Sequence, residues 1–254
     1  MYDAAEYVLM ATLLGAVAGS FLNVVAYRVP RHESLVSPPS HCTSCGTPVK
    51  PYDNVPMLSW LLLRGHCRAC RTPISARYPL VEAATALLCV GVVLERHSLN
   101  GVVLGLLLVL VLVPVALIDF DYHLIPNRIT APAAVLAVVL GSVLNWPGEP
   151  ERLIAGAAAG GFFLLAAMCY PRGMGMGDVK LAGLLGLLLG RAVAPAIFTA
   201  LIVGVLVGIV MFLRAAPDKR REAGIPFGPF LALGGLVGLY AGNAIVAAYL
   251  QHLA

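Results

Sequence analysis

The sequence is poor in charged residues, and this scarcity limits the class of protein. Only 12% of the 254 residues are Asp, Glu, Lys or Arg, while 59% are hydrophobic. A soluble domain has about 25% charged residues. A chain of this size cannot bury such an apolar surplus, so the composition predicts a membrane protein. The formal net charge of +4 is too small to indicate a nucleic-acid partner.

Several familiar motifs are also missing. The first residues, MYDAAEY, lack the basic region of a cleavable signal peptide, so we expect the first apolar segment to be retained as a span. The sequence contains neither G-x-S-x-G nor H-E-x-x-H, which excludes the serine-elbow hydrolases and the zincins. The glycines of GMGMGDVK (173–180) do not fit a phosphate-binding loop either.

Long apolar segments predict an all-α polytopic fold. A helix needs about 20 mostly apolar residues to cross the hydrocarbon core. We predict about eight transmembrane helices, near residues 7–27, 79–95, 101–119, 130–146, 152–170, 179–190, 192–214 and 227–251.

The basic residues of the connecting loops predict the orientation of these helices. With the N-terminus outside, one set of loops holds fourteen Lys or Arg and the other set only three, Arg96, Arg152 and Arg191. Because basic loops stay in the cytoplasm, we expect both termini to be periplasmic. The basic stretch near 214–221 is interpreted as an anchor of this kind, with anionic lipid or substrate as an alternative contact.

The one sizeable polar segment, 28–78, carries two C-x-x-C pairs. Cys42 and Cys45 form the first pair, and Cys67 and Cys70 form the second. Two such knuckles about twenty residues apart are typical of a structural four-cysteine zinc site. Free thiols or two redox pairs are the alternative. Disulfides are not expected in the reducing cytoplasm.

Two aspartates lie at predicted helix ends on the same side of the membrane. Asp119 ends one apolar segment, and Asp178 follows the glycines of GMGMGDVK. Asp121 lies two residues beyond Asp119, so the two point to nearly opposite sides of a helix. Each acid could also be a simple helix cap. Two carboxylates at one site share a proton, and one can activate water while the other polarises a peptide carbonyl.

The same acids leave two other functions open. A proton-coupled transporter would use membrane aspartates, but the predicted spans are almost purely Leu, Val, Ala and Gly, which argues against a polar path. A membrane scaffold with a zinc knuckle and no chemistry is the third hypothesis.

The chain resembles the type IV prepilin peptidases, which are bifunctional leader peptidases and N-methyltransferases. The resemblance covers nearly the whole chain. Its motifs are GSFLNVVAYRVP (19–30), the two C-x-x-C pairs, RYPLVE (77–82), IDFDYHLIPN (118–127), GMGMGDVK (173–180) and IPFGPFLALG (225–234).

This resemblance implies an intramembrane aspartic peptidase of the G-x-G-D type. Asp178 matches the aspartate of that motif, and Asp119 is the implied partner, with Asp121 as the fallback. The glycines and lysine around Asp178 would admit the substrate; they are Gly173, Gly175, Gly177 and Lys180. Prepilins and pseudopilins are the implied substrates, within the lipid bilayer of the bacterial inner membrane and without nucleic acid.

The resemblance also implies N-methylation of the new N-terminus, with S-adenosylmethionine as donor. Gly65 and Glu82 match positions associated with that activity. The implied organisation is an N-terminal region, 1–100, that holds the zinc-knuckle loop and the methyltransferase. A six-helix peptidase region, 101–254, follows it.

Overall fold

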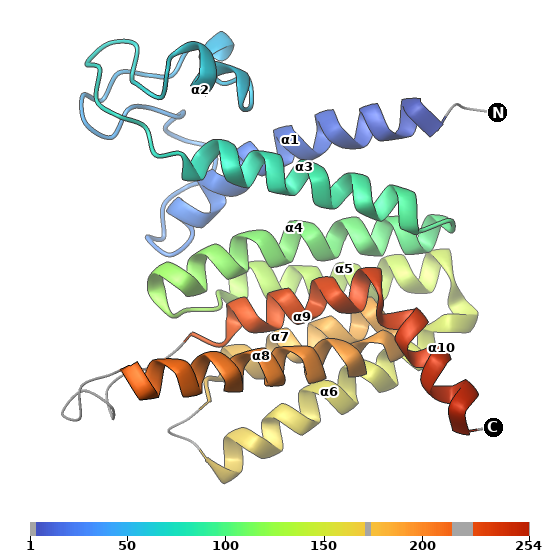
Figure 1. Ribbon diagram of the computed structural model, residues 1–254. Helices are drawn as coiled ribbons and strands as arrows, with labels where there is room; N and C mark the ends of the chain where they lie inside the picture. Colours follow the sequence, from blue (N-terminus) through green and yellow to red (C-terminus); the bar gives the residue numbers. More distant parts are fainter. Residues whose placement is uncertain (1–3, 171–173, 215–225, 254) are drawn as a thin grey trace. The chain divides into compact units, whose positions relative to one another are not determined.

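The computed structural model describes residues 4–170, 174–214 and 226–253, and these residues contain helices but no named strand. The chain separates into two compact units, Met1–His97 and Ser98–Ala254. Figure 1 shows the order of the helices along the chain. The all-α membrane fold expected from composition is therefore confirmed.

The first unit is a pair of helices with a loop module between them in sequence. α1 (Ala4–Arg28) packs against α3 (Arg77–Glu95). The contact is close because Gly15 and Gly19 face α3: an added Cβ would lie 2.8 Å from Ala86 Cα and 2.8 Å from Glu82 Cα, respectively. Small residues four apart permit this approach of two backbones. The loop module contains η1 (Pro51–Asp53) and α2 (Leu58–Leu62).

The second unit is a helical bundle. Its elements are α4 (Leu99–Tyr122), α5 (Asn127–Leu144), η2 (Trp146–Gly148), α6 (Glu149–Cys169), α7 (Met176–Leu189), η3 (Gly190–Ala192), α8 (Val193–Arg214), α9 (Gly228–Tyr240) and α10 (Gly242–Leu253). α4 is the most apolar of the candidate spans and half of it is buried, so it forms much of the core.

Three helices of this bundle begin or end at the same place. α9 runs antiparallel to α4, because Gly228 lies against Asp119 while Gly235 lies against Leu112 further along the pair. Leu185 of α7 also contacts Gly235. At its other end, Gly177 of α7 packs against Ile125, which follows α4. The start of α7, the start of α9 and the end of α4 are therefore neighbours.

Glycines also join α6 to α7. An added Cβ on Gly156 would lie 2.9 Å from the Leu187 side chain, and one on Gly186 would lie 2.6 Å from Gly156 Cα. Gly160 and Gly183 approach each other in the same interface. Dispersion contacts between such closely packed helices replace the hydrophobic driving force that is absent in lipid.

The structure does not fix the number of membrane crossings at the expected eight. Within the described residues, six helical stretches are long and apolar enough to span, or up to seven if α9 and α10 count as one. α7 and α8 are counted in this number as one stretch, Met176–Arg214, although the backbone breaks at Gly190 with φ 59°. α7 alone has 14 residues, about 21 Å at 1.5 Å per residue, against about 30 Å of hydrocarbon. The count of eight therefore stays a prediction.

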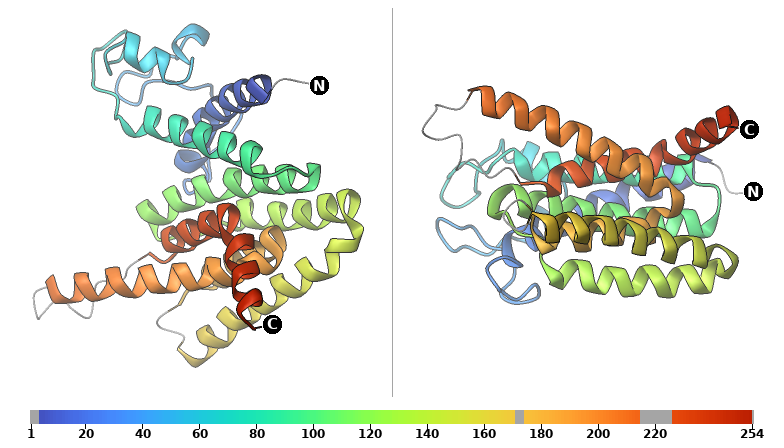
Figure 2. Two further views of the ribbon diagram at one scale, coloured as in Figure 1. Left: turned by 45° about the vertical axis from the view of Figure 1, so that its right-hand side comes forward. Right: turned by 90° about the horizontal axis from the view of Figure 1, so that it is seen from below.

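The last predicted helix, 227–251, is instead two helices. α9 and α10 meet at a bend of 68°, and Figure 2 shows α10 leaving the direction of α9. The backbone comes very close to a neighbour at this bend, since an added Cβ on Gly242 would lie 2.7 Å from Ala192 Cβ. Hydropathy cannot reveal such a bend, because both arms are apolar.

We predict that Gly186→Ala lowers the thermal unfolding midpoint of the purified protein in detergent. Overpacking of a tight contact costs about 1–3 kcal/mol, which outweighs the gain of about 1 kcal/mol in helix propensity. Gly161→Ala is the matched control on α6, because nothing lies within 4 Å of its added Cβ. Circular dichroism during heating would show this difference, and equal midpoints for the two variants would contradict it.

Candidate functional site

Asp119 lies at the end of α4 and is only 5% exposed. The helix ends just beyond it because His123 adopts φ 54° and its N–H caps Asp119 O at 2.9 Å. The Asp119 carboxylate does not face water. Its Oδ2 accepts a hydrogen bond of 2.8 Å from the backbone N–H of Gly228, the first residue of α9. Unpaired N–H groups at a helix start favour a nearby anion.

Gly228 leaves no room for a side chain at this contact. An added Cβ would lie 2.6 Å from Asp119 Oδ2. The sequence analysis assigned no role to this glycine, although it lies in the IPFGPFLALG segment. The Gly-Pro pair that begins α9 is the signal that could have indicated a helix start, since proline favours the first turn.

Asp178 lies in the first turn of α7 and is partly buried. Its Oδ2 accepts a hydrogen bond of 3.3 Å from the N–H of Gly175, the cap expected of an acid at this position. Gly177 is needed for close packing, because an added Cβ would lie 2.9 Å from Ile125 Cβ. Gly173, the first glycine of the predicted substrate loop, lies outside the described residues.

The structure brings Asp119 and Asp178 together from helices 59 positions apart in sequence. Gly177, next to Asp178, packs against Ile125 just beyond the end of α4, so the two carboxylates lie at neighbouring helix ends. A hydrogen bond also joins the start of α7 to the start of α5, since the exposed Lys180 donates from Nζ to Asn127 Oδ1 at 2.9 Å. Asp121, the fallback partner, is exposed at the end of α4. A buried carboxylate beside a second one can exchange a proton with water and with a peptide bond.

The four cysteines of the first unit form one cluster. The Sγ atoms of Cys42, Cys45, Cys67 and Cys70 all lie within 4.8 Å of one another. Cys42 Sγ and Cys70 Sγ are 3.8 Å apart, which matches the edge of a tetrahedron with zinc–sulfur bonds of about 2.3 Å. The donor set and its spacing therefore fit a structural zinc site, with no position left for water.

The two knuckles repeat the same local structure. Cys42 N–H donates to Thr47 O and Cys67 N–H donates to Thr72 O, both at 2.9 Å. The residue after each second cysteine has positive φ, 71° for Gly46 and 60° for Arg71. The two knuckles thus form a backbone pseudo-repeat, and it aims all four thiols at one point.

Threonine side chains favour the thiolate form of two cysteines. Thr72 Oγ1 lies 3.2 Å from Cys70 Sγ, and this hydrogen bond lowers the pKa of Cys70 to about 6. The hydroxyl of Thr47, 3.3 Å from Cys45 Sγ, likewise lowers the pKa of Cys45. Thiolates are the form that binds metal, so the two threonines favour metal binding by Cys45 and Cys70.

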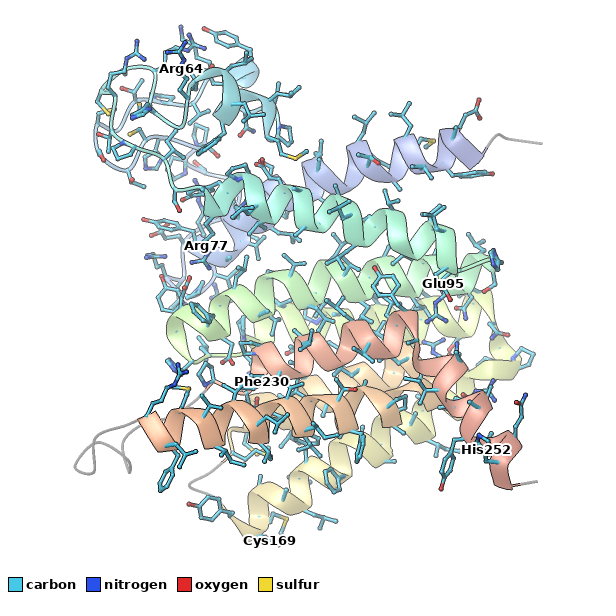
Figure 3. All side chains as sticks on the ribbon, viewed as in Figure 1. Arg64, Arg77, Glu95, Cys169, Phe230 and His252 are labelled. Carbon is cyan, nitrogen blue, oxygen red and sulfur yellow. The ribbon has the colours of Figure 1, made fainter. Side chains whose placement is uncertain are left out.

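Gly65 and Glu82 hold the two ends of α2. Gly65 follows α2 with φ 69°, and an added Cβ would lie 2.9 Å from the Trp60 ring. It comes directly after Arg64, on the loop module in Figure 3. Glu82 of α3 is 8% exposed, and its Oε2 accepts a hydrogen bond of 2.7 Å from Met57 N–H at the other end of α2. Neither residue contacts the cysteine cluster directly.

Cys67→Ser is predicted to abolish stoichiometric metal binding by the purified protein. The loss follows because one thiolate of a four-ligand site is removed. Elemental analysis of zinc per chain measures it. Cys169→Ser is the matched control, since Cys169 is exposed at the end of α6 and outside the cluster. Equal zinc content in both variants would refute a metal site here.

Comparison with known proteins found two family models that divide the chain. The Bacterial Peptidase A24 N-terminal domain matches residues 13–96, and the Type IV leader peptidase family matches residues 106–213. Proteins named prepilin leader peptidase/N-methyltransferase are similar along their whole length. The one from Pseudomonas putida is 36% identical over 99% of this chain and 96% of its own. The one from Aeromonas hydrophila is 36% identical over 97% and 94%. The one from Pseudomonas aeruginosa is 34% identical over 96% and 94%. No solved structure matches the chain.

Proposed function

The chain belongs to the type IV leader peptidase family, and from this premise we propose that Asp119 and Asp178 are the catalytic pair of its peptidase. It is a multi-pass membrane enzyme that cleaves the leader of prepilins and N-methylates the new N-terminus. None of the findings supports the transporter that composition alone left open.

The observation that carries the catalytic proposal is the meeting of three helix ends around Asp119. α4 supplies the buried carboxylate, α9 supplies the Gly228 N–H at 2.8 Å, and α7, which carries Asp178, begins beside this end of α4, where Gly177 packs against Ile125. The N–H of Gly228 holds Oδ2 of Asp119. Because the carboxylate is rigid, this hydrogen bond also fixes the direction of Oδ1. Asp121 lacks this burial, which favours Asp119 as the partner.

The pair can hydrolyse a peptide without a covalent intermediate. One carboxylate takes a proton from water, and the resulting hydroxide adds to the carbonyl carbon. The other, protonated, donates a hydrogen bond to the carbonyl oxygen and then a proton to the leaving nitrogen as the C–N bond breaks. The pair gains one proton from water and gives one proton to the leaving nitrogen. It therefore again holds one proton after the reaction.

The substrate and the orientation agree with this placement. The loops expected in the cytoplasm carry fourteen of seventeen Lys and Arg residues, and the site lies at helix ends on that side. A prepilin has a basic leader inside the cell and an apolar helix in the membrane. We propose that the cut occurs at this cytoplasmic interface, with the termini of the enzyme periplasmic, as the charge bias predicts. Gly175, Gly177 and Lys180 would border the approach.

For the second activity we propose S-adenosylmethionine as the methyl donor, which supplies an electrophilic methyl group when bound. The hollow of about 300 Å³ beside α1 does not fit this cation, because its only charged residue is Arg28 and it has no carboxylate. Gly65 and Glu82 contribute instead by holding α2 in place: Gly65 packs against the Trp60 ring, and Glu82 of α3 accepts a hydrogen bond from Met57 N–H. The zinc we propose for the four cysteines holds the same module together, since so short a loop has little core of its own.

Asp178→Ala and Asp119→Ala are each predicted to reduce leader cleavage by about 10⁴-fold or more, since a dyad acts as one unit. Cleavage of a purified prepilin in detergent, followed by gel mobility, measures this. Asp119→Asn should be equally inactive, whereas Asp121→Asn should keep most activity because Asp121 is exposed. The reverse result would assign Asp121 to the pair, and full activity of both alanine variants would refute the dyad.

Gly65→Ala should impair methyl transfer more than Gly46→Ala does. Both glycines have positive φ, 69° and 71°, so both variants carry the same backbone strain of about 1 kcal/mol. Only Gly65 faces a neighbour, the Trp60 ring, while nothing lies within 4 Å of Gly46. Transfer of a labelled methyl group to pre-cleaved pilin would show the difference. Equal losses would mean that backbone strain alone explains the sensitivity of Gly65.

A further inference from the structure

A buried ion pair lies in the second unit, away from both aspartates. Arg152 and Glu149, in the first turn of α6, are 6% and 2% exposed, and Arg152 Nη1 lies 3.0 Å from Glu149 Oε2. Charged side chains within a membrane bundle are costly, and they usually mark a function. The proposed peptidase mechanism does not use either residue.

The guanidinium of Arg152 joins three helices. Its Nε donates to Leu187 O of α7 at 2.8 Å, and its Nη2 donates to Ala137 O of α5 at 2.6 Å. Gly141 of α5 leaves space for it, since an added Cβ there would collide with the guanidinium. Only a planar group with several fixed donors can meet acceptors on α5, α6 and α7 at once.

Leu187 belongs to the last turn of α7, where backbone carbonyls lack an intrahelical partner. In an apolar medium an unpaired carbonyl is expensive. Arg152 supplies the missing donor and also a positive charge, which a helix C-terminus favours. Arg152 therefore fixes the position of this end of α7 along the helix axis.

α7 is thus tied to α5 at both of its ends. At the C-terminal end of α7, Arg152 bridges the two helices by hydrogen bonds to Leu187 O of α7 and Ala137 O of α5. Near Asp178, Lys180 of α7 donates a hydrogen bond to Asn127 of α5. A helix is stiff along its axis, so a shift at Leu187 moves Asp178, nine residues or about 13.5 Å away.

We propose that Arg152 is a positioning residue for the peptidase: it sets the axial position of α7 and thereby the placement of Asp178 relative to Asp119. The inference rests on the proposed catalytic pair. Buried ion pairs add little net stability compared with apolar side chains of similar size, so stability alone does not account for this one. Its bonds to α5 and α7 carry the geometric role.

The test uses the double variant Arg152→Met/Glu149→Gln, which removes the donors without leaving an unpaired buried charge. We expect kcat for leader cleavage to fall by about 10²-fold, as for a displacement of about 1 Å at a catalytic group, with KM within about twofold. Methyl transfer to pre-cleaved pilin should stay at the wild-type rate and reports an intact, inserted enzyme. Arg152→Lys keeps the ion pair but cannot reach both carbonyls. Its kcat for leader cleavage should therefore lie between the values of the wild type and the double variant.

Arg191→Met is the matched control, because Arg191 lies at the same end of α7, is exposed and only reaches Glu151 at 4.0 Å. Its kcat should equal that of the wild type. The proposal is overturned if the double variant and Arg152→Lys both keep wild-type kcat. It is equally overturned if methyl transfer falls in parallel with cleavage, which would mean general damage. Failure of the catalytic pair itself would appear separately, as cleavage by Asp178→Ala.

Discussion

The hydrogen bond from Gly228 N–H to Asp119 Oδ2 is the interaction on which the candidate peptidase site depends. It joins the end of α4 to the start of α9, and it satisfies a buried carboxylate that would otherwise be isolated in an apolar setting. The bond requires glycine, because any side chain at 228 would occupy the position of the carboxylate. The site is therefore built from the ends of three helices, where backbone donors are free.

Close packing through glycine gives this site its rigidity. Gly177 lets the start of α7 approach Ile125, and the glycines of α6 and α7 let their backbones meet. Arg152 then holds the other end of α7 through two carbonyls. The glycines before Asp178 were expected to admit the substrate, and at Gly177 the structure gives a further reason for glycine, close contact with Ile125.

The two units use different means to hold a functional segment in place. In the second, helix ends are aligned by packing and by a few buried polar bonds. In the first, a loop of low apolar content is organised by four convergent thiols and by the contacts of Gly65 and Glu82 at the two ends of α2. The pairing of Asp53 with Arg68, at 2.6 Å, adds to this loop and keeps the pKa of Asp53 below its ordinary value.

The sequence by itself determined the membrane class, the helical fold, the four-cysteine cluster and the family, because apolar segments and short motifs are local signals. It also placed Asp119 and Asp178 at helix ends. Only the tertiary structure decided that Asp119 is buried and Asp121 exposed, since two residues on one turn are distinguished by their neighbours. The roles of Gly228 and Arg152 were equally hidden, because each forms a hydrogen bond with a residue more than 30 positions away, Asp119 and Leu187 respectively. The bend between α9 and α10 depends on the approach to Ala192, and hydropathy carries no information about such a contact.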